Sequence, residues 1–189
     1  MMLALLGSSL QSKVLRRCAR GMAVLAVCAL PALAAVQAAE KPDSSYVPDV
    51  GQEGKDVVWV PTPQTLVDKM IDMAKAAPGD TLIDLGSGDG RLVITAAQRG
   101  IKAHGIEYNP EMVELARRNA QAAGVSGRAT FAKADLFETD LSGASVITLF
   151  LLPTINEKLR PHLLDLKPGT RVVSNTFSMG DWRPDEQAT

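Results

Sequence analysis

The stretch TLIDLGSGDGRLVI, residues 81–94, decides the fold of this chain. An apolar run typical of a buried strand leads into a loop of alternating glycines, and an apolar run typical of a helix follows it. A glycine-rich turn between a strand and a helix usually lies against a bound nucleotide, because glycine lets the backbone approach a ligand closely. The loop residues of interest are Asp84, Gly86, Ser87, Gly88, Asp89 and Gly90.

Strand-like and helix-like segments alternate after this loop, which predicts parallel βαβ units. A doubly wound α/β sheet, Rossmann-like, is therefore the expected fold, with its ligand at the carboxyl ends of the strands where the strand order reverses. The expected strands are 81–86, 102–108, 129–135, 145–152 and 170–177, and the expected helices lie within 61–80, 91–100, 109–124 and 154–166.

Two details of the helices are predictable from capping and periodicity. Thr62 is expected to cap the first helix with Pro63 at its first position, and Asn109 with Pro110 to do the same for the third. In the first helix, the apolar positions that share one face at helical spacing are Leu66, Met70, Met73, Ala74 and Ala77.

The ends of the chain differ from its middle. Residues 1–39 contain four basic and no acidic residues, a long apolar run and both cysteines, which predicts a signal peptide and an exported protein, periplasmic or secreted. A membrane anchor, giving membrane association through this leader, and a mitochondrial presequence are the alternatives. Residues 40–60 are expected to be an irregular lead-in, 61–183 the ligand-binding domain and 184–189 a tail.

Charge argues against a nucleic-acid partner. The whole chain has a formal net charge of −1, and without the four basic residues of the leader 16 Lys and Arg face 21 Asp and Glu, a net charge of −5. Proteins that grip a phosphate backbone usually carry a basic surplus instead. No nucleic-acid partner is therefore expected.

The chemistry of the loop indicates which nucleotide binds. The dinucleotide pattern G-x-G-x-x-G fails because Arg91 stands after Gly90, and no phosphate-binding G-K-[ST] follows. Asp84 and Asp89 would repel a pyrophosphate but attract S-adenosylmethionine, whose ionisable groups give it a net charge of about +1. The acids are expected to meet its ammonium and sulfonium, and the amides at the start of the second helix its carboxylate.

Two further acids stand at strand ends. Glu107, beside Tyr108, ends the second strand, where it can accept hydrogen bonds from both ribose hydroxyls. Asp135 ends the third and can accept the adenine amino group, with Leu136 packing on the ring. His104 and His162 have no partner pattern that would make either a base, no metal-ligand cluster is present, and no catalytic residue is assigned.

DLGSGDG, GIEYNP and ADLF resemble motifs I to III of the class I S-adenosylmethionine-dependent methyltransferases. VPTPQTLVDKMI, FLLP and VVSNTFSMGDWRPD are similar to the small protein-lysine methyltransferases related to the mitochondrial ATP synthase c-subunit enzyme. The resemblance implies methylation of an amine, with a protein lysine as the acceptor. A non-catalytic binding module and a small-molecule N- or O-methyltransferase are the alternatives.

The end of the fourth strand and the end of the chain add two expectations. FLLPT, residues 150–154, lacks the [DN]-P-P-[YF] motif of nucleic-acid amino methyltransferases, and Tyr46, Phe150, Thr176 and Trp182 are by analogy candidates for the acceptor channel. The class I sheet normally has seven strands, whereas this sequence supplies five, so the sheet is expected to be truncated after the fifth. Its exposed edge then favours self-association.

Overall fold

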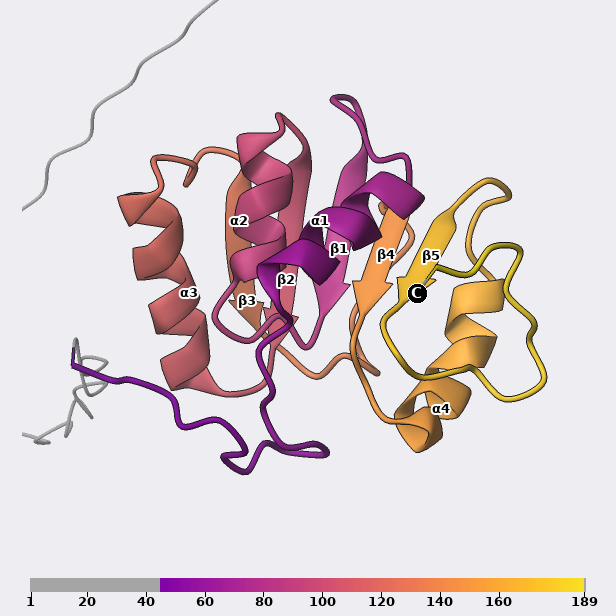
Figure 1. Ribbon diagram of the computed structural model, residues 1–189, viewed down its shortest axis with the longest axis horizontal. Helices are drawn as coiled ribbons and strands as arrows, with labels where there is room; N and C mark the ends of the chain where they lie inside the picture. Colours follow the sequence, from indigo (N-terminus) through magenta and orange to yellow (C-terminus); the bar gives the residue numbers. More distant parts are fainter. Residues whose placement is uncertain (1–44, 189) are drawn as a thin grey trace, which may run out of the picture. The chain divides into compact units, whose positions relative to one another are not determined.

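The computed structural model describes residues 45–188, and these residues form the doubly wound α/β fold that the sequence predicts (Figure 1). All strand pairs are parallel, and the five strands lie in the order β3-β2-β1-β4-β5. The strands are β1 Thr81–Leu85, β2 Lys102–Glu107, β3 Ala129–Lys133, β4 Val146–Leu149 and β5 Arg171–Ser174. The helices are α1 Gln64–Met73, α2 Arg91–Gln98, α3 Pro110–Ala122 and α4 Pro153–Leu164.

Alternate residues of the central strands serve two different cores, because successive side chains of a strand point to opposite faces. Leu82 and Val146 pack with buried side chains of α1, α2 and α3, whereas Ile83 and Ile147 pack with Leu159 and others on and around α4. The sheet is therefore covered on both faces. Burial on both faces explains why its inner strands are almost continuously apolar.

The strand order reverses between β1 and β4, which are hydrogen-bonded neighbours although two helices and two strands separate them in sequence. A parallel sheet binds its ligand at such a reversal, outside the carboxyl ends of the strands. In Figure 1 the segment before α1, drawn in indigo, runs past the arrowheads of the strands. This edge therefore carries the glycine loop and the lead-in together.

The beginning of α1 differs from the prediction. Pro63, not Thr62, is the N-cap residue, with ψ of 143° and no side-chain capping bond. The carbonyl of Thr62 instead accepts a hydrogen bond from Arg91 at 2.9 Å, and the amides of Leu66 and Val67 bond to the carbonyl of Pro63. A tertiary contact from α2 thus replaces the local cap, and the helix starts one residue later.

The predicted apolar face of α1 is also wrong in part. Leu66 is 40% exposed, whereas Val67, Met70, Ile71 and Ala74 are buried. The helix ends at Met73, so Ala77 lies beyond it. The packed face is rotated by about one residue, because α1 lies against α2 and β5 and this packing decides which side is covered.

The third helix confirms its predicted cap. The side chain of Asn109 accepts hydrogen bonds from the amides of Glu111 at 2.8 Å and Met112 at 3.4 Å, and Pro110 occupies the first helical position. Gly124 follows the helix with φ of +71°, a left-handed conformation that favours glycine. Local sequence signals are therefore sufficient to predict both ends of α3.

Three predictions concern the ends of the chain. The predicted leader, residues 1–39, lies outside the described residues. Between residues 45 and 188, no helix is long and apolar enough to cross a bilayer. Within the same part of the chain, β5 pairs with β4 and with no further strand, and self-association at this edge stays a prediction.

Candidate cofactor-binding site

A cleft opens at the carboxyl ends of the strands, with about 1100 Å³ of empty space when the part open to solvent is included. The glycine loop forms its floor, and residues following β2, β3 and β4 line it further. All ten predicted cofactor-site residues except Gly90 line this cleft: Asp84, Gly86, Ser87, Gly88, Asp89, Glu107, Tyr108, Asp135 and Leu136. Of the four candidates for the acceptor channel, Phe150 lines it, whereas Tyr46, Thr176 and Trp182 do not. The structure therefore brings together residues that come from the ends of three different strands.

Asp84 lies at the bottom of the cleft and is only 7% exposed. Its Oδ1 accepts a hydrogen bond of 2.6 Å from the hydroxyl of Thr148, its register partner on β4, which is fully buried. Burial, followed by the negative charges of Glu107 and Asp89, raises the pKa of Asp84 to about 7, against the effect of the Thr148 bond. A cation bound in the cleft would relieve this repulsion.

The glycines of the loop are required for steric reasons as well as for access to a ligand. Gly88 and Gly90 have φ of +54° and +84°, where other residues are strained. A Cβ at Gly90 would lie 2.7 Å from the Phe131 ring and 2.9 Å from Ala116. A Cβ at Gly88 would lie 2.6 Å from the indole nitrogen of Trp59. Gly90 thus packs the loop onto α3 and β3, while Gly88 faces the cleft.

The amides of the loop are used within the protein. The amides of Gly86 and Ser87 both donate to the carbonyl of Ile106, and that of Gly90 donates to the carbonyl of Ser87. The amide of Gly88 donates to Glu107 at 3.0 Å. That the amides at the start of α2 receive the cofactor carboxylate stays a prediction, and the first of them, the amide of Arg91, here donates to Asp89 at 3.3 Å.

Glu107 connects the loop with the start of α3. One carboxylate oxygen accepts from Gly88 at 3.0 Å and the other from the amide of Asn109 at 2.9 Å. Both bonds come from backbone amides, so they fix the carboxylate and leave further lone pairs on each oxygen. The carboxylate is thereby held at the end of β2, where the sequence places a ribose-binding group.

Asp135 is bound by Lys55, a residue of the lead-in. The Lys55 ammonium lies 2.5 Å from Oδ2 of Asp135 and 4.8 Å from the centroid of the Tyr108 ring, while Oδ1 accepts from the amide of Phe137 at 2.9 Å. The Lys55 bond, aided by the Phe137 amide, holds the pKa of Asp135 below its usual range. The acid predicted to receive an adenine amino group thus already binds an amino group of the chain.

Asp89 has a different environment from the other acids. Its carboxylate accepts bonds from the guanidinium of Arg91, the closest at 2.6 Å, and Arg91 also binds the carbonyl of Thr62. Arg91 therefore links Asp89 and the start of α2 to the segment before α1. A contact between Asp89 and the cofactor remains a prediction.

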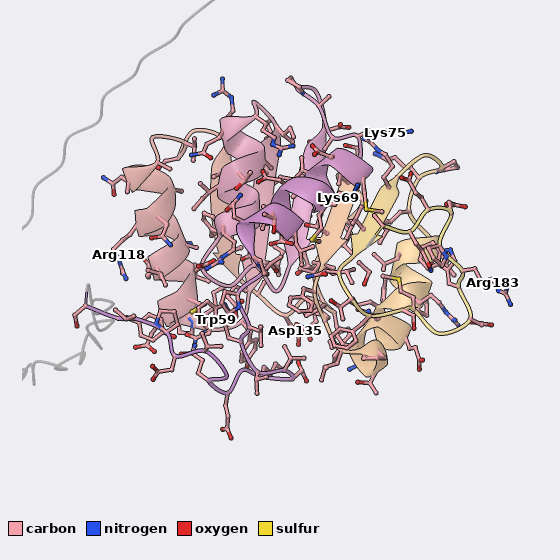
Figure 2. All side chains as sticks on the ribbon, viewed as in Figure 1. Trp59, Lys69, Lys75, Arg118, Asp135 and Arg183 are labelled. Carbon is pink, nitrogen blue, oxygen red and sulfur yellow. The ribbon has the colours of Figure 1, made fainter. Side chains whose placement is uncertain are left out.

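The lead-in contributes residues to the cleft that the sequence analysis missed. Residues 52–62 line the cleft continuously, and Trp59 lies against Gly88. Figure 2 shows Trp59 and Asp135 at the same edge of the molecule, below the sheet. The sequence signal that could have revealed this contact is the apolar run VVWV, residues 57–60, inside an otherwise polar lead-in. Such a run favours packing of its tryptophan against the protein.

The other residues with catalytic or ligand chemistry lie elsewhere. His104 contacts the Thr130 hydroxyl on β3, and burial lowers its pKa. Among residues 45–188, no group of three His, Cys, Asp or Glu side chains is arranged to hold a metal ion.

An acid-lined cleft over a glycine loop at the switch point of a parallel sheet defines a class I S-adenosylmethionine-dependent methyltransferase, and the comparisons with known proteins agree. The model of the ANTKMT methyltransferase domain family matches residues 84–186. The chain belongs to this family.

Relatives and solved structures are consistent with the assignment. The chain is 46% identical over 145 residues to a protein-lysine N-methyltransferase of Saccharolobus islandicus, covering 75% of this chain and 86% of that protein. It is 38% identical over 128 residues to the mouse lysine N-methyltransferase of the ATP synthase c-subunit, covering 67% of this chain and 51% of the mouse protein. It therefore spans about half the length of that mouse relative.

A crystal structure from Salinibacter ruber, described as an RNA methyltransferase in complex with S-adenosyl-L-homocysteine, is 51% identical. The two structures superpose with a TM-score of 0.67, and the alignment covers 69% of this chain and 86% of the Salinibacter chain. The cofactor of this protein is S-adenosylmethionine, as predicted.

Proposed function

We propose that this protein transfers the methyl group of S-adenosylmethionine to the side-chain amine of a protein lysine. The observation that carries the proposal is the asymmetry of the cleft. Carboxylates line it at the ends of β1, β2 and β3 and, in the lead-in, at Glu53 and Asp56, whereas the lining residues after β4 are apolar and aromatic, Phe150 and Leu151 among them. Such a surface suits an alkylamine better than a polar nucleobase edge.

The cofactor roles follow from the positions of the acids. Glu107 receives the ribose hydroxyls, Asp135 the adenine amino group once Lys55 releases it, and Tyr108 and Leu136 flank the ring. Asp84 and Asp89 supply negative charge for the ammonium and sulfonium of the methionine part. Gly86, Ser87 and Gly88 form the floor, and the positive φ of both glycines allows this close approach, while Gly90 packs the loop onto α3 and β3.

Bound S-adenosylmethionine supplies an activated methyl group. The amine nitrogen forms a bond to the methyl carbon as the carbon–sulfur bond breaks, and S-adenosylhomocysteine leaves. The lysine must first lose a proton, which an apolar environment favours by lowering the pKa of the ammonium. The protein's part is to align the nitrogen with the methyl group and to exclude water. The apolar residues after β4 can do both.

Methylation of RNA is the second candidate, because the Salinibacter structure at 51% identity is described as an RNA methyltransferase. The charge of the chain favours protein, since the acidic excess after the leader opposes binding to a phosphate backbone. The lysine N-methyltransferases of Saccharolobus and mouse also support protein.

The test is a direct comparison of the two acceptors. The protein is incubated with methyl-labelled S-adenosylmethionine and either the protein or the RNA fraction of a bacterial extract. The products are hydrolysed and separated as amino acids or nucleosides, and Glu107→Gln, assayed at a limiting cofactor concentration, is the control that should transfer less label. Label in methyllysine supports the proposal. Label confined to nucleosides overturns it in favour of RNA.

We further propose export for this protein, on the basis of residues 1–39. Fractionation of cells that produce the full chain, with mass spectrometry of its N-terminus, tests this. An N-terminus near residue 40 on the far side of the cell membrane supports export, whereas an intact leader in the cytosolic fraction contradicts it.

A further inference from the structure

The acids of the cleft account for the side of β2 and β3, and the proposed function leaves the opposite side, over β4 and β5, to the methyl acceptor. Phe150 follows β4 and lines the cleft together with Asp84 and Gly86. The ring of Phe177, which follows β5, stacks on it with centroids 6.0 Å apart and an interplanar angle of 19°. Both side chains are half-buried.

We infer that the stacked rings of Phe150 and Phe177 form the acceptor subsite, which takes an alkylamine side chain such as that of lysine. This inference rests on the proposed function and names the residues that select the acceptor. Phe150 reaches the cofactor cleft, while Phe177 extends the aromatic surface away from it. The two rings therefore lead from the outside of the molecule toward the reacting methyl group.

The turn that carries Phe177 is strained, which argues that its position matters. Thr176 has φ of +66°, a left-handed conformation that is costly for a β-branched residue. Such strain persists where surrounding contacts over-determine the backbone, and it gathers at functional sites. The structure thus holds the ring in place against a local preference.

Those surrounding contacts come from a buried side chain of α4. Asn156 is fully buried, and its side-chain amide donates to the carbonyls of Phe177 at 3.4 Å and Ser178 at 3.1 Å. The hydroxyl of Ser174 donates to the carbonyl of Phe177 at 2.6 Å. Because two carbonyls face the amide, its nitrogen must point toward the turn. Asn156 is therefore a positioning residue for Phe177.

The chemistry of the two rings fits an amine on an aliphatic chain. Aromatic faces attract a cation through their quadrupole, and they pack against methylene groups. The rings bind the ammonium, and loss of water as the amine moves on toward the methyl group favours its neutral, nucleophilic form. Rings also stack on nucleobases. The excess of acidic residues in the chain favours an amine over a nucleobase, and the experiment below distinguishes these two ligands.

The experiment measures how much an amine arm adds to cofactor affinity. The full chain is titrated calorimetrically with S-adenosylhomocysteine and with an analogue whose sulfur is replaced by a nitrogen bearing an aminoalkyl arm. A third compound carries a neutral hydrocarbon arm of equal length. We expect the aminoalkyl arm to improve affinity about tenfold, a gain that a cation over aromatic rings can supply.

Variants of the protein then test which residues contact the aminoalkyl arm. Phe177→Leu and Phe150→Leu should reduce the gain to about twofold, and Phe177→Tyr should retain it. Phe177→Leu should leave S-adenosylhomocysteine affinity unchanged. Leu164→Ala, which truncates an exposed apolar side chain of α4, is the matched control and should keep the full gain. Thermal unfolding of each variant shows whether it is folded.

The outcomes separate this inference from the proposed function. A full gain in both folded leucine variants overturns the aromatic subsite, even if the wild-type protein methylates lysine. An equal gain from the neutral arm overturns its selectivity for an amine. Displacement of the arm by a nucleoside monophosphate, with label found only in RNA, overturns both the amine subsite and the proposed methylation of lysine. Loss of the gain in Phe150→Leu and Phe177→Leu, with the gain kept in Phe177→Tyr and Leu164→Ala, supports the subsite.

Discussion

Thr148 and Asp84 face each other across β1 and β4, and a 2.6 Å hydrogen bond joins them at the bottom of the cofactor cleft. Both are buried, so the carboxylate has one hydroxyl donor and two neighbouring acids but no basic partner among the hydrogen bonds and ion pairs of residues 45–188. The site is thus electrostatically incomplete without a cation. Its negative charge is a property of the fold, set by the register of two strands.

The first prediction concerns the pH dependence of cofactor binding. The pKa of Asp84 is about 7 in the free protein, and a bound cation lowers it, so binding requires loss of a proton. The affinity for S-adenosylmethionine should rise about tenfold between pH 6 and pH 8. Calorimetry in buffers of different ionisation enthalpy measures the released proton. Asp84→Asn is the control, because the cofactor's own amino group titrates equally in both proteins. An identical pH profile in the variant would contradict the role of Asp84.

The second prediction concerns the stability of the free protein. The folded pKa of Asp84 lies above its unfolded value, so between about pH 4 and pH 7 the folded state binds more protons than the unfolded state. The contribution of Asp84 to the free energy of unfolding should therefore fall as pH rises through this window. In chemical denaturation, Asp84→Asn should lose stability less steeply than the wild type over this range. Parallel pH profiles for the two proteins would show that Asp84 is not protonated in the folded state.

The third prediction concerns Glu107→Gln. The amide has the size of the carboxylate, but its NH2 group must face the amide hydrogen of either Gly88 or Asn109, where both are donors. The affinity for S-adenosylhomocysteine should fall about tenfold or more. Glu111→Gln, on the exposed start of α3, is the matched control and should bind normally. Unchanged affinity in Glu107→Gln would remove Glu107 from the cofactor site.

The fourth prediction concerns Lys55→Ala. The ammonium occupies the oxygen of Asp135 that an adenine amino group needs, so its removal should tighten cofactor binding a few-fold. It should also reduce the dependence of affinity on salt, because an exposed ion pair no longer has to be broken. Lys75→Ala, a lysine far from the cleft in Figure 2, serves as control. Weaker binding in Lys55→Ala would mean that the lysine assists the adenine instead of competing with it.

The fifth prediction concerns Gly90→Ala. The added Cβ meets Phe131 and Ala116 at under 3.0 Å, and the residue must keep φ of +84°. The free energy of unfolding should fall by about 2–4 kcal/mol, the sum of strain and overpacking. Gly143→Ala, where a Cβ meets nothing within 4 Å and φ is not positive, is the control. A smaller loss than in Gly143→Ala would contradict this account of the loop.

The sequence predicted the fold well because its signals are local. Strand–helix alternation, the Asn109 cap and the glycine loop each depend on a few adjacent residues. The start and the packed face of α1 were wrong, because Arg91 from α2 binds Thr62 and the packing against α2 and β5 selects Val67 instead of Leu66. Both errors come from contacts between elements distant in sequence.

The candidate site was predictable to the extent that strand ends reveal it. Asp84, Glu107 and Asp135 converge because carboxyl ends of parallel strands share one edge. The partners of these acids were not predictable, since Thr148 reaches Asp84 through the register of β4 and Lys55 reaches Asp135 through the path of the lead-in. The contact of Trp59 with Gly88 depends on the same path. The stacking of Phe150 on Phe177 likewise depends on the strained turn at Thr176, which no sequence pattern predicts.

The path of residues 52–62 over the cleft has a consequence for turnover. Pro61 and Pro63 restrict the backbone at its junction with α1, and Arg91 binds the carbonyl of Thr62 between them, so this junction is the fixed end of the segment. Lys55 on Asp135 and Trp59 on Gly88 cover two positions where the cofactor is expected, so we expect the segment to move when S-adenosylmethionine enters and when S-adenosylhomocysteine leaves. We expect the residence time of the spent cofactor, and with it the rate limit on successive methylations, to depend on residues 52–62 as well as on the methyltransferase domain that follows them.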